Sequence, residues 1–385
     1  MKRKIAVLII NRANYGRLKP VLGAIQDHPG LELQTLVGSS MLLSGLGEAV
    51  KFMKADRFPV SAVLPMAREG EAVDHATMVS IAGRELPETV PQVFSQLEPD
   101  IVLVHADRFE IIPVAMAAAY MNIPVAHTLG GEVTGTIDET VRHAVTKIAH
   151  IHFPATEKSK ERILRMGEDP KFVFMVGCAT IDFLKSMDLA MDNSLQDKYK
   201  PEFKYDLKKP YFVVMQHPVT TDTSHSYEQM MELLEAVAEF KLPTLIFRPN
   251  IDAGGARINN AINTFKERHK PDFIVVYKNM IPEDYSNVLA NAVCAIGNSS
   301  SFIREGSYLG TPAVVVGNRQ MNRERAGNVM EVGYNRNEIK DAIQKQLAQG
   351  KYVSSNLYGD GQTSERVANI LSEVQPPIQK NFHDN

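Results

Sequence analysis

The sequence is poor in cysteine, in long apolar runs and in excess charge of either sign. Its two cysteines, Cys178 and Cys294, lie far apart beside apolar runs, which predicts buried free thiols and argues against a disulfide scaffold or a cysteine metal site. The formal net charge of -3 supplies no basic surface for nucleic acid. The apolar run at residues 5–10 is too short to cross a membrane or to act as a signal core. We therefore expect a cytoplasmic protein with no membrane or nucleic-acid partner.

Apolar runs of strand length alternate with helical patterns along the chain. In the first half these runs lie at residues 5–10, 31–37, 101–104, 125–129 and 173–176, and in the second half at 211–215, 244–247, 273–276, 293–296 and 313–316. Helical patterns occupy longer segments such as 72–97, 111–121 and 363–374. This alternation is typical of parallel sheets covered by helices on both faces.

A polar, lysine-rich stretch at residues 188–209 interrupts the alternation. We place the domain boundary there, because 385 residues with 44% hydrophobic side chains are enough for two cores. The prediction is an α/β protein of two Rossmann-like, doubly wound domains that face a cleft. The first domain covers residues 1–190, the second covers 205–365, and residues 366–385 form a C-terminal helix and a loosely held tail.

Polar clusters follow the predicted strands at their carboxyl ends. They occupy residues 11–15, 105–108 and 130–132 in the first domain, and 216–218, 248–252 and 297–300 in the second. Open α/β sheets bind ligands at these strand ends. We therefore expect the functional residues of both domains to come from these six loops.

The turn at residues 297–301 combines a glycine, an asparagine and three serines before a helix that starts near Phe302. Backbone N–H groups and hydroxyls of Ser299 and Ser300 at a helix start favour a phosphate. Glu305, one helical turn later, would be repelled by a phosphate and suits the hydroxyls of a ribose. The alternative is an ordinary serine N-cap on a structural helix.

Ordered sequence blocks in both predicted domains resemble one family. The blocks read NRANYGRLKP, HADRFE, GGEVTGTID, RHAVTKIAH, QHPVTTD, PNIDAG, GNSSSFIREG, GTPAVVVGNRQ and LYGDG. Together they resemble the hydrolysing UDP-N-acetylglucosamine 2-epimerases, including the epimerase half of the bifunctional animal enzyme that starts sialic acid synthesis. The resemblance implies the glycosyltransferase-B arrangement of the two domains, no metal or other cofactor, a UDP-sugar substrate and a homo-oligomer, either a dimer or a tetramer.

The resemblance also implies the reaction: UDP-N-acetylglucosamine and water become UDP and N-acetylmannosamine. UDP leaves across C1–C2 to give a 2-acetamidoglucal, and water then adds to the opposite face. The departing diphosphate needs cationic and N–H donors. The resemblance adds Arg12, Arg319 and His217 to the serines for this task, with His217 as a catalytic donor to the leaving oxygen. It assigns Asn250 and Asp252 to the uridine side, where an Asx-turn is the alternative for Asp252.

The C1–C2 bond requires carboxylates that remove and return protons. The candidates are Asp107, Glu132 and Asp138, all on loops of the first domain. Asp107 has a structural alternative as a helix cap or half of an ion pair, and Asp138 has one as an N-cap. Three neighbouring residues would orient the acids or contact the sugar, unless they belong to a solvated helix face or a supporting salt bridge: Arg108, Arg142 and His143.

One position departs from the family pattern. The block before Glu132 commonly reads His-Ile-Glu-Gly-Gly-Glu in these epimerases, and the first acid is assigned a catalytic role. Here that position is Leu129, which cannot transfer a proton. Either Glu132 or Asp107 replaces the missing acid, or the substrate is UDP-2,4-diacetamido-2,4,6-trideoxyglucose of legionaminic acid synthesis. A non-hydrolysing epimerase, a glycosyltransferase and a non-catalytic nucleotide-sugar sensor are the remaining alternatives.

Overall fold

The computed structural model describes residues 2–44, 48–66, 68–69, 74–191, 194–249, 252–278 and 280–384. Their contacts divide the chain into two compact units. Unit 1 comprises Met1–Glu132, Ile137–Ser186 and Tyr358–Asn385, and unit 2 comprises Val133–Thr136 and Met187–Leu357. The sequence placed the second boundary at residue 365 and set 366–385 apart, whereas the structure groups everything after Leu357 with unit 1.

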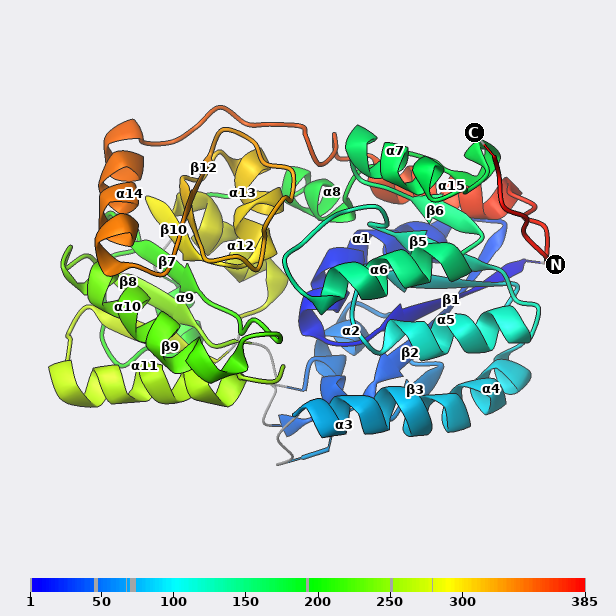
Figure 1. Cartoon of the computed structure of the whole chain (residues 1–385), viewed down its shortest axis with the longest axis horizontal. Coiled ribbons are helices and arrows are strands. Elements are labelled where there is room, and N and C mark those ends of the chain that lie inside the picture. The colour runs from blue at the N-terminus through cyan, green and yellow to red at the C-terminus, as the bar shows by residue number, and fades with distance from the viewer. Residues whose placement is uncertain are drawn as a thin grey trace. The chain divides into compact units, whose positions relative to one another are not determined.

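Unit 1 contains a six-stranded sheet in the order β3-β2-β1-β4-β5-β6 (Figure 1). All neighbouring strands run parallel. The strands are β1 (Arg3–Ile9), β2 (Leu31–Gly38), β3 (Ala62–Leu64), β4 (Ile101–His105), β5 (Val125–Thr128) and β6 (Ile151–Phe153). Every residue of β4 and β5 is buried, which explains their nearly continuous apolar runs. The strand order reverses between β1 and β4, where such sheets bind ligands.

Helices cover both faces of this sheet. They are α1 (Arg12–Asp27), α2 (Val50–Ala55), α3 (His75–Ser80), α4 (Leu86–Leu97), α5 (Ile111–Tyr120), α6 (Ile137–Ile148), α7 (Glu157–Arg165), α8 (Ala179–Lys185) and α15 (Thr363–Glu373). A π-helical turn, Ile81–Glu85, joins α3 to α4. One apolar core draws on α1, α8 and α15, and a second draws on α4, α5 and α6. None of the described helices has the length and apolar character needed to cross a membrane.

Unit 2 repeats the same architecture. Its sheet has the order β12-β11-β10-β7-β8-β9, so its reversal point lies between β7 and β10. The strands are β7 (Phe212–Met215), β8 (Thr244–Phe247), β9 (Ile274–Tyr277), β10 (Cys294–Gly297), β11 (Ala313–Val316) and β12 (Val329–Val332). The helices are α9 (Ser194–Tyr199), α10 (Ser226–Ala238), α11 (Gly255–His269), α12 (Pro282–Asn291), α13 (Arg304–Leu309) and α14 (Arg336–Gln349). The predicted α/β class with two Rossmann-like units is confirmed.

The predicted strand at residues 173–176 is wrong. This segment forms only an isolated bridge, from Val173 to His152, and the sixth strand is the preceding β6. The reason is Pro154, which directly follows β6 and has no N–H to continue a ladder. The prediction lacks three short strands: β3 has only three residues, and His152 and Glu331 interrupt the apolar runs of β6 and β12.

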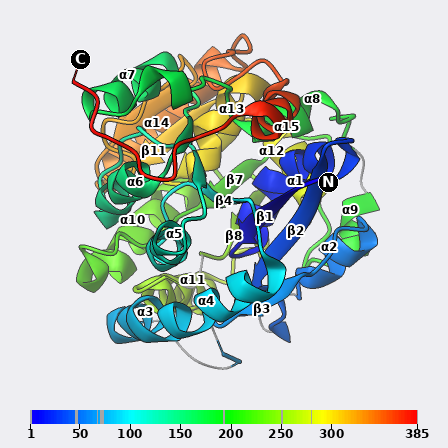
Figure 2. The same ribbon diagram turned by 90° about the vertical axis from the view of Figure 1, so that its right-hand side faces the viewer.

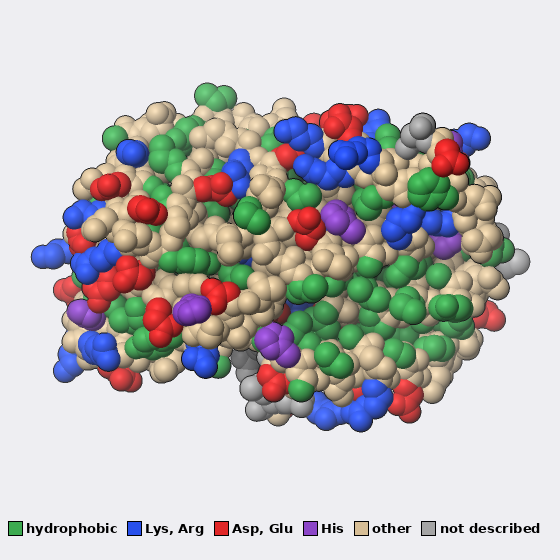
Figure 3. Space-filling view, in the orientation of Figure 1, with side chains coloured by type: hydrophobic (Ala, Val, Ile, Leu, Met, Phe, Trp, Pro, Cys, Tyr) green, Lys and Arg blue, Asp and Glu red, His purple; other side chains and the backbone are tan. Residues whose placement is uncertain are grey.

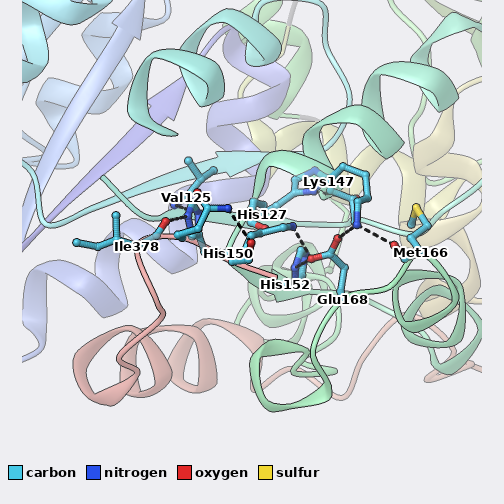
Figure 4. A network of polar contacts seen from close by, with 12 residues as sticks. Val125, His127, Lys147, His150, His152, Met166, Glu168 and Ile378 are labelled. Carbon is cyan, nitrogen blue, oxygen red and sulfur yellow. Dashed lines mark hydrogen bonds and ion pairs between the residues drawn. The ribbon is translucent and has the colours of Figure 1, made fainter. Parts of the chain in front are cut away.

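The prediction of a loosely held C-terminal tail is also wrong. Helix α15 packs beside α1 and α8 (Figure 2). Beyond it, the Ile378 carbonyl accepts from His150 Nε2 at 3.0 Å, and Lys380 Nζ donates to the Ala149 carbonyl at 2.8 Å (Figure 4 shows the His150–Ile378 contact). The His383 N–H donates to the Gly167 carbonyl at 3.0 Å. The tail is therefore fastened to unit 1 by both side chains and backbone.

Candidate active site

The acid Asp107 lies in the loop that follows β4, at the reversal point of the unit 1 sheet. Ala106 precedes it with φ +65, a left-handed conformation that is uncommon for alanine. Arg142 on α6 forms an ion pair with the Asp107 carboxylate. The Arg142 side chain is 0% exposed, and a buried guanidinium needs a charged partner to offset its lost hydration. Asp107 is therefore half of an ion pair, the structural role that the sequence left open beside catalysis.

The acid Glu132 follows two glycines after β5. Gly131 has φ +74, and a Cβ there would lie 2.1 Å from the Ser159 carbonyl oxygen, so only glycine fits. The Glu132 carbonyl accepts from Arg142 Nη1 at 2.7 Å. One buried guanidinium thus holds the Asp107 carboxylate and the main-chain carbonyl of Glu132, so the loops that carry these two acids meet at Arg142.

The third acid, Asp138, is the second residue of α6 and half-buried. It lies four residues before Arg142, which places both on one side of the helix. A carboxylate in the first turn is also favoured by the helix dipole. His143 lies 3.8 Å from Glu139, and burial together with the nearby Arg142 charge lowers the pKa of His143.

Two of the predicted cationic residues, Arg108 and Arg12, follow β4 and its neighbour β1. Arg108 bonds Glu110 through Nε and Nη2, each at 3.1 Å, and its guanidinium lies 5.4 Å from the centre of the Phe109 ring. This is the supporting salt bridge that the sequence offered as an alternative for Arg108. Arg12 is the first residue of α1, directly after β1, and β1 pairs with β4. Arg12 and Asp107 therefore follow the two strands that border the reversal point.

His217 occupies the corresponding position in unit 2. It follows β7, and its N–H donates to Asn298 Oδ1 at 2.7 Å while Asn298 Nδ2 donates to the His217 carbonyl at 2.8 Å. Asn298 follows β10, the partner of β7. Gly297, the last residue of β10, has φ +132, and a Cβ there would lie 2.2 Å from the Met215 carbonyl oxygen, so only glycine fits. This reciprocal amide pair fixes His217 next to the serine turn.

The serine turn begins a 3-10 helix, Ser300–Phe302, followed by α13. Ser299 is its N-cap: its hydroxyl accepts from the Ser301 N–H and lies 2.8 Å from Ser301 Oγ. Ser299 therefore has the structural role that the sequence offered as an alternative to phosphate binding, that of a serine N-cap. Ser300 Oγ lies 3.5 Å from Arg304 Nη1, and Glu305 is 6% exposed in the first turn of α13.

The remaining candidates of unit 2 lie around the same strand ends. Arg319, which the family resemblance added to the candidates, follows β11 and donates from Nη1 to the Asn298 carbonyl of the serine turn at 3.2 Å. Asp252 precedes α11, where its carbonyl accepts from the Gly255 N–H at 2.9 Å. Asn250 lies outside the described residues. Within the part of the chain that the structure describes, no cluster of three His, Cys, Asp or Glu could hold a metal.

Sequence reasoning missed two features of these sites. Asn298 organises both His217 and Arg319, but its partners depend on the pairing of β7 with β10. In unit 1, His127 and Thr146 are both 0% exposed and lie beneath the loops that carry Asp107 and Glu132. Helical periodicity could have predicted the burial of Thr146, because Arg142 and Thr146 are four residues apart on a face of α6 that also buries Val141 and Val145.

Comparisons with known proteins identify the family of this chain. The family described as UDP-N-acetylglucosamine 2-epimerase matches residues 24–372. A UDP-N,N'-diacetylbacillosamine 2-epimerase (hydrolyzing) of Legionella pneumophila is 34% identical over 374 residues, with 97% of each chain covered. A UDP-N-acetylglucosamine 2-epimerase of Neisseria meningitidis is 27% identical over 388 residues, with 99% of each chain covered.

A solved structure gives the same fold. The UDP-GlcNAc 2-epimerase of Neisseria meningitidis, bound to UDP-GlcNAc, superimposes with a TM-score of 0.79 over 96% of this chain and 99% of that chain, at 17% identity. The family match spans most of the chain, and the Legionella relative is similar over nearly its full length. The chain belongs to the UDP-N-acetylglucosamine 2-epimerase family.

Proposed function

We propose that this protein is a hydrolysing UDP-sugar 2-epimerase, which converts a UDP-2-acetamido sugar and water into UDP and the free sugar inverted at C2. The observation that carries the proposal is the junction at Arg142, where one buried guanidinium holds the Asp107 carboxylate and the Glu132 backbone. Mere binding of an anionic nucleotide gains nothing from grouped carboxylates, because like charges repel. Proton transfer at carbon requires them.

The reaction needs one group to remove the C2 proton and another to return a proton from the opposite face. We assign this acid–base work to Asp107, Glu132 and Asp138. Positioned acids and bases of this kind contribute about 10²- to 10⁴-fold each. Elimination across C1–C2 breaks the C2–H and C1–O bonds, releases UDP and leaves the 2-acetamidoglucal. Water then adds its hydroxyl to C1 and a proton to C2.

UDP departure builds negative charge on the bridging oxygen of the β-phosphate. In unit 2 we assign the donors to His217, Ser300 and Arg319, with Ser299 shaping the turn as its N-cap. Helix α13 has only six residues, so its dipole is short and the arginine and hydroxyl donors carry more of the stabilisation. Four further residues complete the proposed substrate contacts: Glu305 at the ribose, Asn250 and Asp252 toward uridine, and Arg12 toward the diphosphate.

The proposed substrate is UDP-2,4-diacetamido-2,4,6-trideoxyglucose, the sugar named in the Legionella relative as UDP-N,N'-diacetylbacillosamine. Leu129 supports this choice, because it stands where related sequences place a glutamate, and it is 1% exposed. The acid found at this position in those relatives is therefore absent here, which favours a UDP-amino sugar other than UDP-N-acetylglucosamine. UDP-N-acetylglucosamine, which would give N-acetylmannosamine, is the second candidate because the Neisseria relative is named for it.

The product of either reaction is a free 2-acetamido sugar of the manno configuration, which suits synthesis of sialic-type, nonulosonic acids in the cytoplasm. We also propose that the chain forms a homo-oligomer. Apolar side chains gather over α4 and α5 (Figure 3), and Met116 and Tyr120 of α5 are 44% and 84% exposed. Helix α5 carries no charged residue, and a helix apolar on all sides is normally covered. A second copy of this chain is the proposed cover.

A panel of UDP-amino sugars, each incubated with enzyme and water alone, tests the function. We expect equimolar UDP and free 2-epimerised sugar by mass spectrometry and NMR, with the 2,4-diacetamido sugar used faster than UDP-N-acetylglucosamine. Asp107→Asn enzyme is the matched control and should release neither product. Recovery of an epimerised UDP-sugar would indicate the non-hydrolysing reaction, and UDP binding without any turnover would overturn the proposal.

A further inference from the structure

A buried histidine–threonine pair lies directly beneath the two acid-bearing loops of unit 1. His127 on β5 and Thr146 on α6 are both 0% exposed. His127 Nε2 lies 2.8 Å from the Ala106 carbonyl oxygen, and His127 Nδ1 lies 3.3 Å from Thr146 Oγ1. Figure 4 shows His127 among the polar residues of this region. Because buried polar groups are nearly always hydrogen-bonded, each donor and acceptor of this pair should have a partner.

The contacts assign those hydrogens. A carbonyl oxygen can only accept, so His127 Nε2 carries the proton that it donates to Ala106. Burial lowers the pKa of His127 to about 4, so the ring is neutral at neutral pH and Nδ1 is an acceptor. The Thr146 hydroxyl, which also lies 3.0 Å from the Arg142 carbonyl oxygen, shares its one hydrogen between Nδ1 and that carbonyl. Each of the two side chains therefore joins two segments.

The histidine acts on Asp107 through the backbone. The Ala106 carbonyl belongs to the peptide group that contains the Asp107 nitrogen, so fixing its direction fixes the start of the Asp107 residue. Ala106 has φ +65, a conformation that costs about 1 kcal/mol for a non-glycine residue and persists only where neighbours enforce it. Two bonds do so: the one from His127, and one from the Ala106 N–H to the Thr128 carbonyl at 3.0 Å.

The threonine acts on both acids through α6 and the glycine loop. It bonds the backbone of Arg142, whose side chain holds Asp107 and the Glu132 carbonyl. Gly130 lies on top of the pair: a Cβ there would be 3.0 Å from His127 Nδ1 and 3.0 Å from Thr146 Oγ1. The pair thus contacts the Asp107 loop, the Glu132 loop and the helix that carries Asp138.

We propose that His127 and Thr146 are positioning residues, which set the carboxylates of Asp107 and Glu132 in the geometry needed for proton transfer at C2. The inference rests on the proposed function. Neither residue touches the substrate; both act through Ala106, Gly130 and Arg142. Because proton transfer is sensitive to displacements of about 1 Å, loss of the pair is expected to slow the chemical step and to leave nucleotide binding by unit 2 unchanged.

The test removes the Thr146 hydroxyl and keeps its shape. Thr146→Val is expected to lower kcat about tenfold or more, with KM and UDP affinity within about twofold of wild type. Thr146→Ser retains the hydroxyl and should restore most of kcat. Thr35→Val is the matched control, because Thr35 is also 0% exposed in unit 1 and its hydroxyl donates to the Pro59 carbonyl, away from these loops. It should reduce stability without reducing kcat.

Two histidine variants keep the inference testable if Thr146→Val fails to fold. His127→Gln places an amide N–H near the position of Nε2 and should retain more activity than His127→Leu, which has no donor. Wild-type kcat in Thr146→Val, or equal kcat in the two histidine variants, would overturn the inference while leaving the proposed function intact. A wild-type enzyme that releases no UDP from any UDP-amino sugar would overturn the proposed function, and the inference would fall with it.

Discussion

The two units have the same strand order but carry opposite chemistry at the ends of their strands. In unit 1 the loops after β4 and β5 carry Asp107 and Glu132, and the buried Arg142 holds the Asp107 carboxylate and the Glu132 main-chain carbonyl, with the buried His127 beneath them. In unit 2 the corresponding loops carry serine hydroxyls, the Asn298 amide and Arg319. Under the proposed function, one architecture would support a proton-transfer surface in unit 1 and an anion-binding surface in unit 2.

The difference shows that the sheets supply position while the loops supply chemistry. In unit 1 each loop is fixed by charge: an ion pair to Asp107 and a charge-assisted bond to Glu132. In unit 2 neutral hydrogen bonds join His217 to Asn298, and the Arg319 guanidinium donates to the Asn298 carbonyl. The comparison predicts that changes in unit 1 alter the chemical step and acid sensitivity, whereas changes in unit 2 alter nucleotide affinity.

The largest expected effect comes from neutralising the central acid of unit 1. Asp107→Asn keeps the shape of the side chain but removes its basicity and its charge toward Arg142, so kcat should fall about 10³-fold or more while UDP affinity changes little. Isothermal titration with UDP and a turnover assay measure the two quantities. A wild-type rate in this variant would remove Asp107 from the mechanism.

Acid sensitivity should also separate the units. His127 has its pKa lowered from 6.5 to about 4 by burial, so the unfolded chain binds a proton at higher pH than the folded chain does. The free energy of unfolding of unit 1 therefore has its full value, as far as His127 is concerned, above pH 6.5. It falls by roughly 3 kcal/mol as the pH decreases from 6.5 toward 4. Hydrogen exchange at pH 7.5 and 5 should show β5 losing more protection than β7. Equal losses in both sheets would contradict this difference.

Glu168 makes the stability of unit 1 depend on pH in a second, more acidic range. Burial alone would raise its pKa, but hydrogen bonds from His152 and Lys147 (Figure 4) and from Lys380 together lower it to about 2. The carboxylate therefore stabilises unit 1 above pH 4.5, and this stabilisation is lost as pH falls from 4.5 toward 2.

In unit 2 the largest loss of UDP affinity is expected when Arg319 is replaced. Arg319→Gln keeps hydrogen-bonding capacity but removes the charge, and charged hydrogen bonds contribute about 1.5–3 kcal/mol, so UDP affinity should fall about 10- to 100-fold. The matched control is Arg325→Gln, since Arg325 pairs with Glu331 in the same unit. Unchanged affinity in Arg319→Gln would place the diphosphate elsewhere.

The smallest expected effect concerns the surfaces remote from both sites. Tyr120→Asp on the apolar face of unit 1 should dissociate the oligomer in sedimentation velocity and leave the monomer folded. Val353→Asp is the control, because Val353 is 92% exposed in unit 2 and lies outside that face. Dissociation by both variants, or by neither, would refute the proposed interface.

Much of the fold was open to prediction because buried parallel strands such as β4 and β10 are continuous apolar runs. The loops were predictable for the same reason, since polar residues stand out after such runs. β6 was not, because Ile151–Phe153 contains His152 and is followed by Pro154, and neither signals a strand. Its neighbour at residues 173–176 has the stronger pattern and almost no pairing.

The site was predictable in its residue types but not in its connections. Asp107, Glu132 and Arg142 were all candidates, yet the ion pair joins residues 35 positions apart, which no local pattern encodes. Ser299 was predicted as a phosphate ligand or a cap, and only the contact from the Ser301 N–H distinguishes its present role. The role of His127 could not be predicted, because nothing in the sequence around a histidine inside an apolar strand identifies Ala106 and Thr146 as its partners.

The most direct measurement follows the hydrogen at C2. Wild-type enzyme is incubated with the UDP-amino sugar in deuterated water, and the products are examined by NMR. Elimination and rehydration on the unit 1 acids predict one UDP for each free sugar, with deuterium at C2 of the inverted product. Free sugar that retains protium at C2, or an inverted sugar still attached to UDP, would contradict the account.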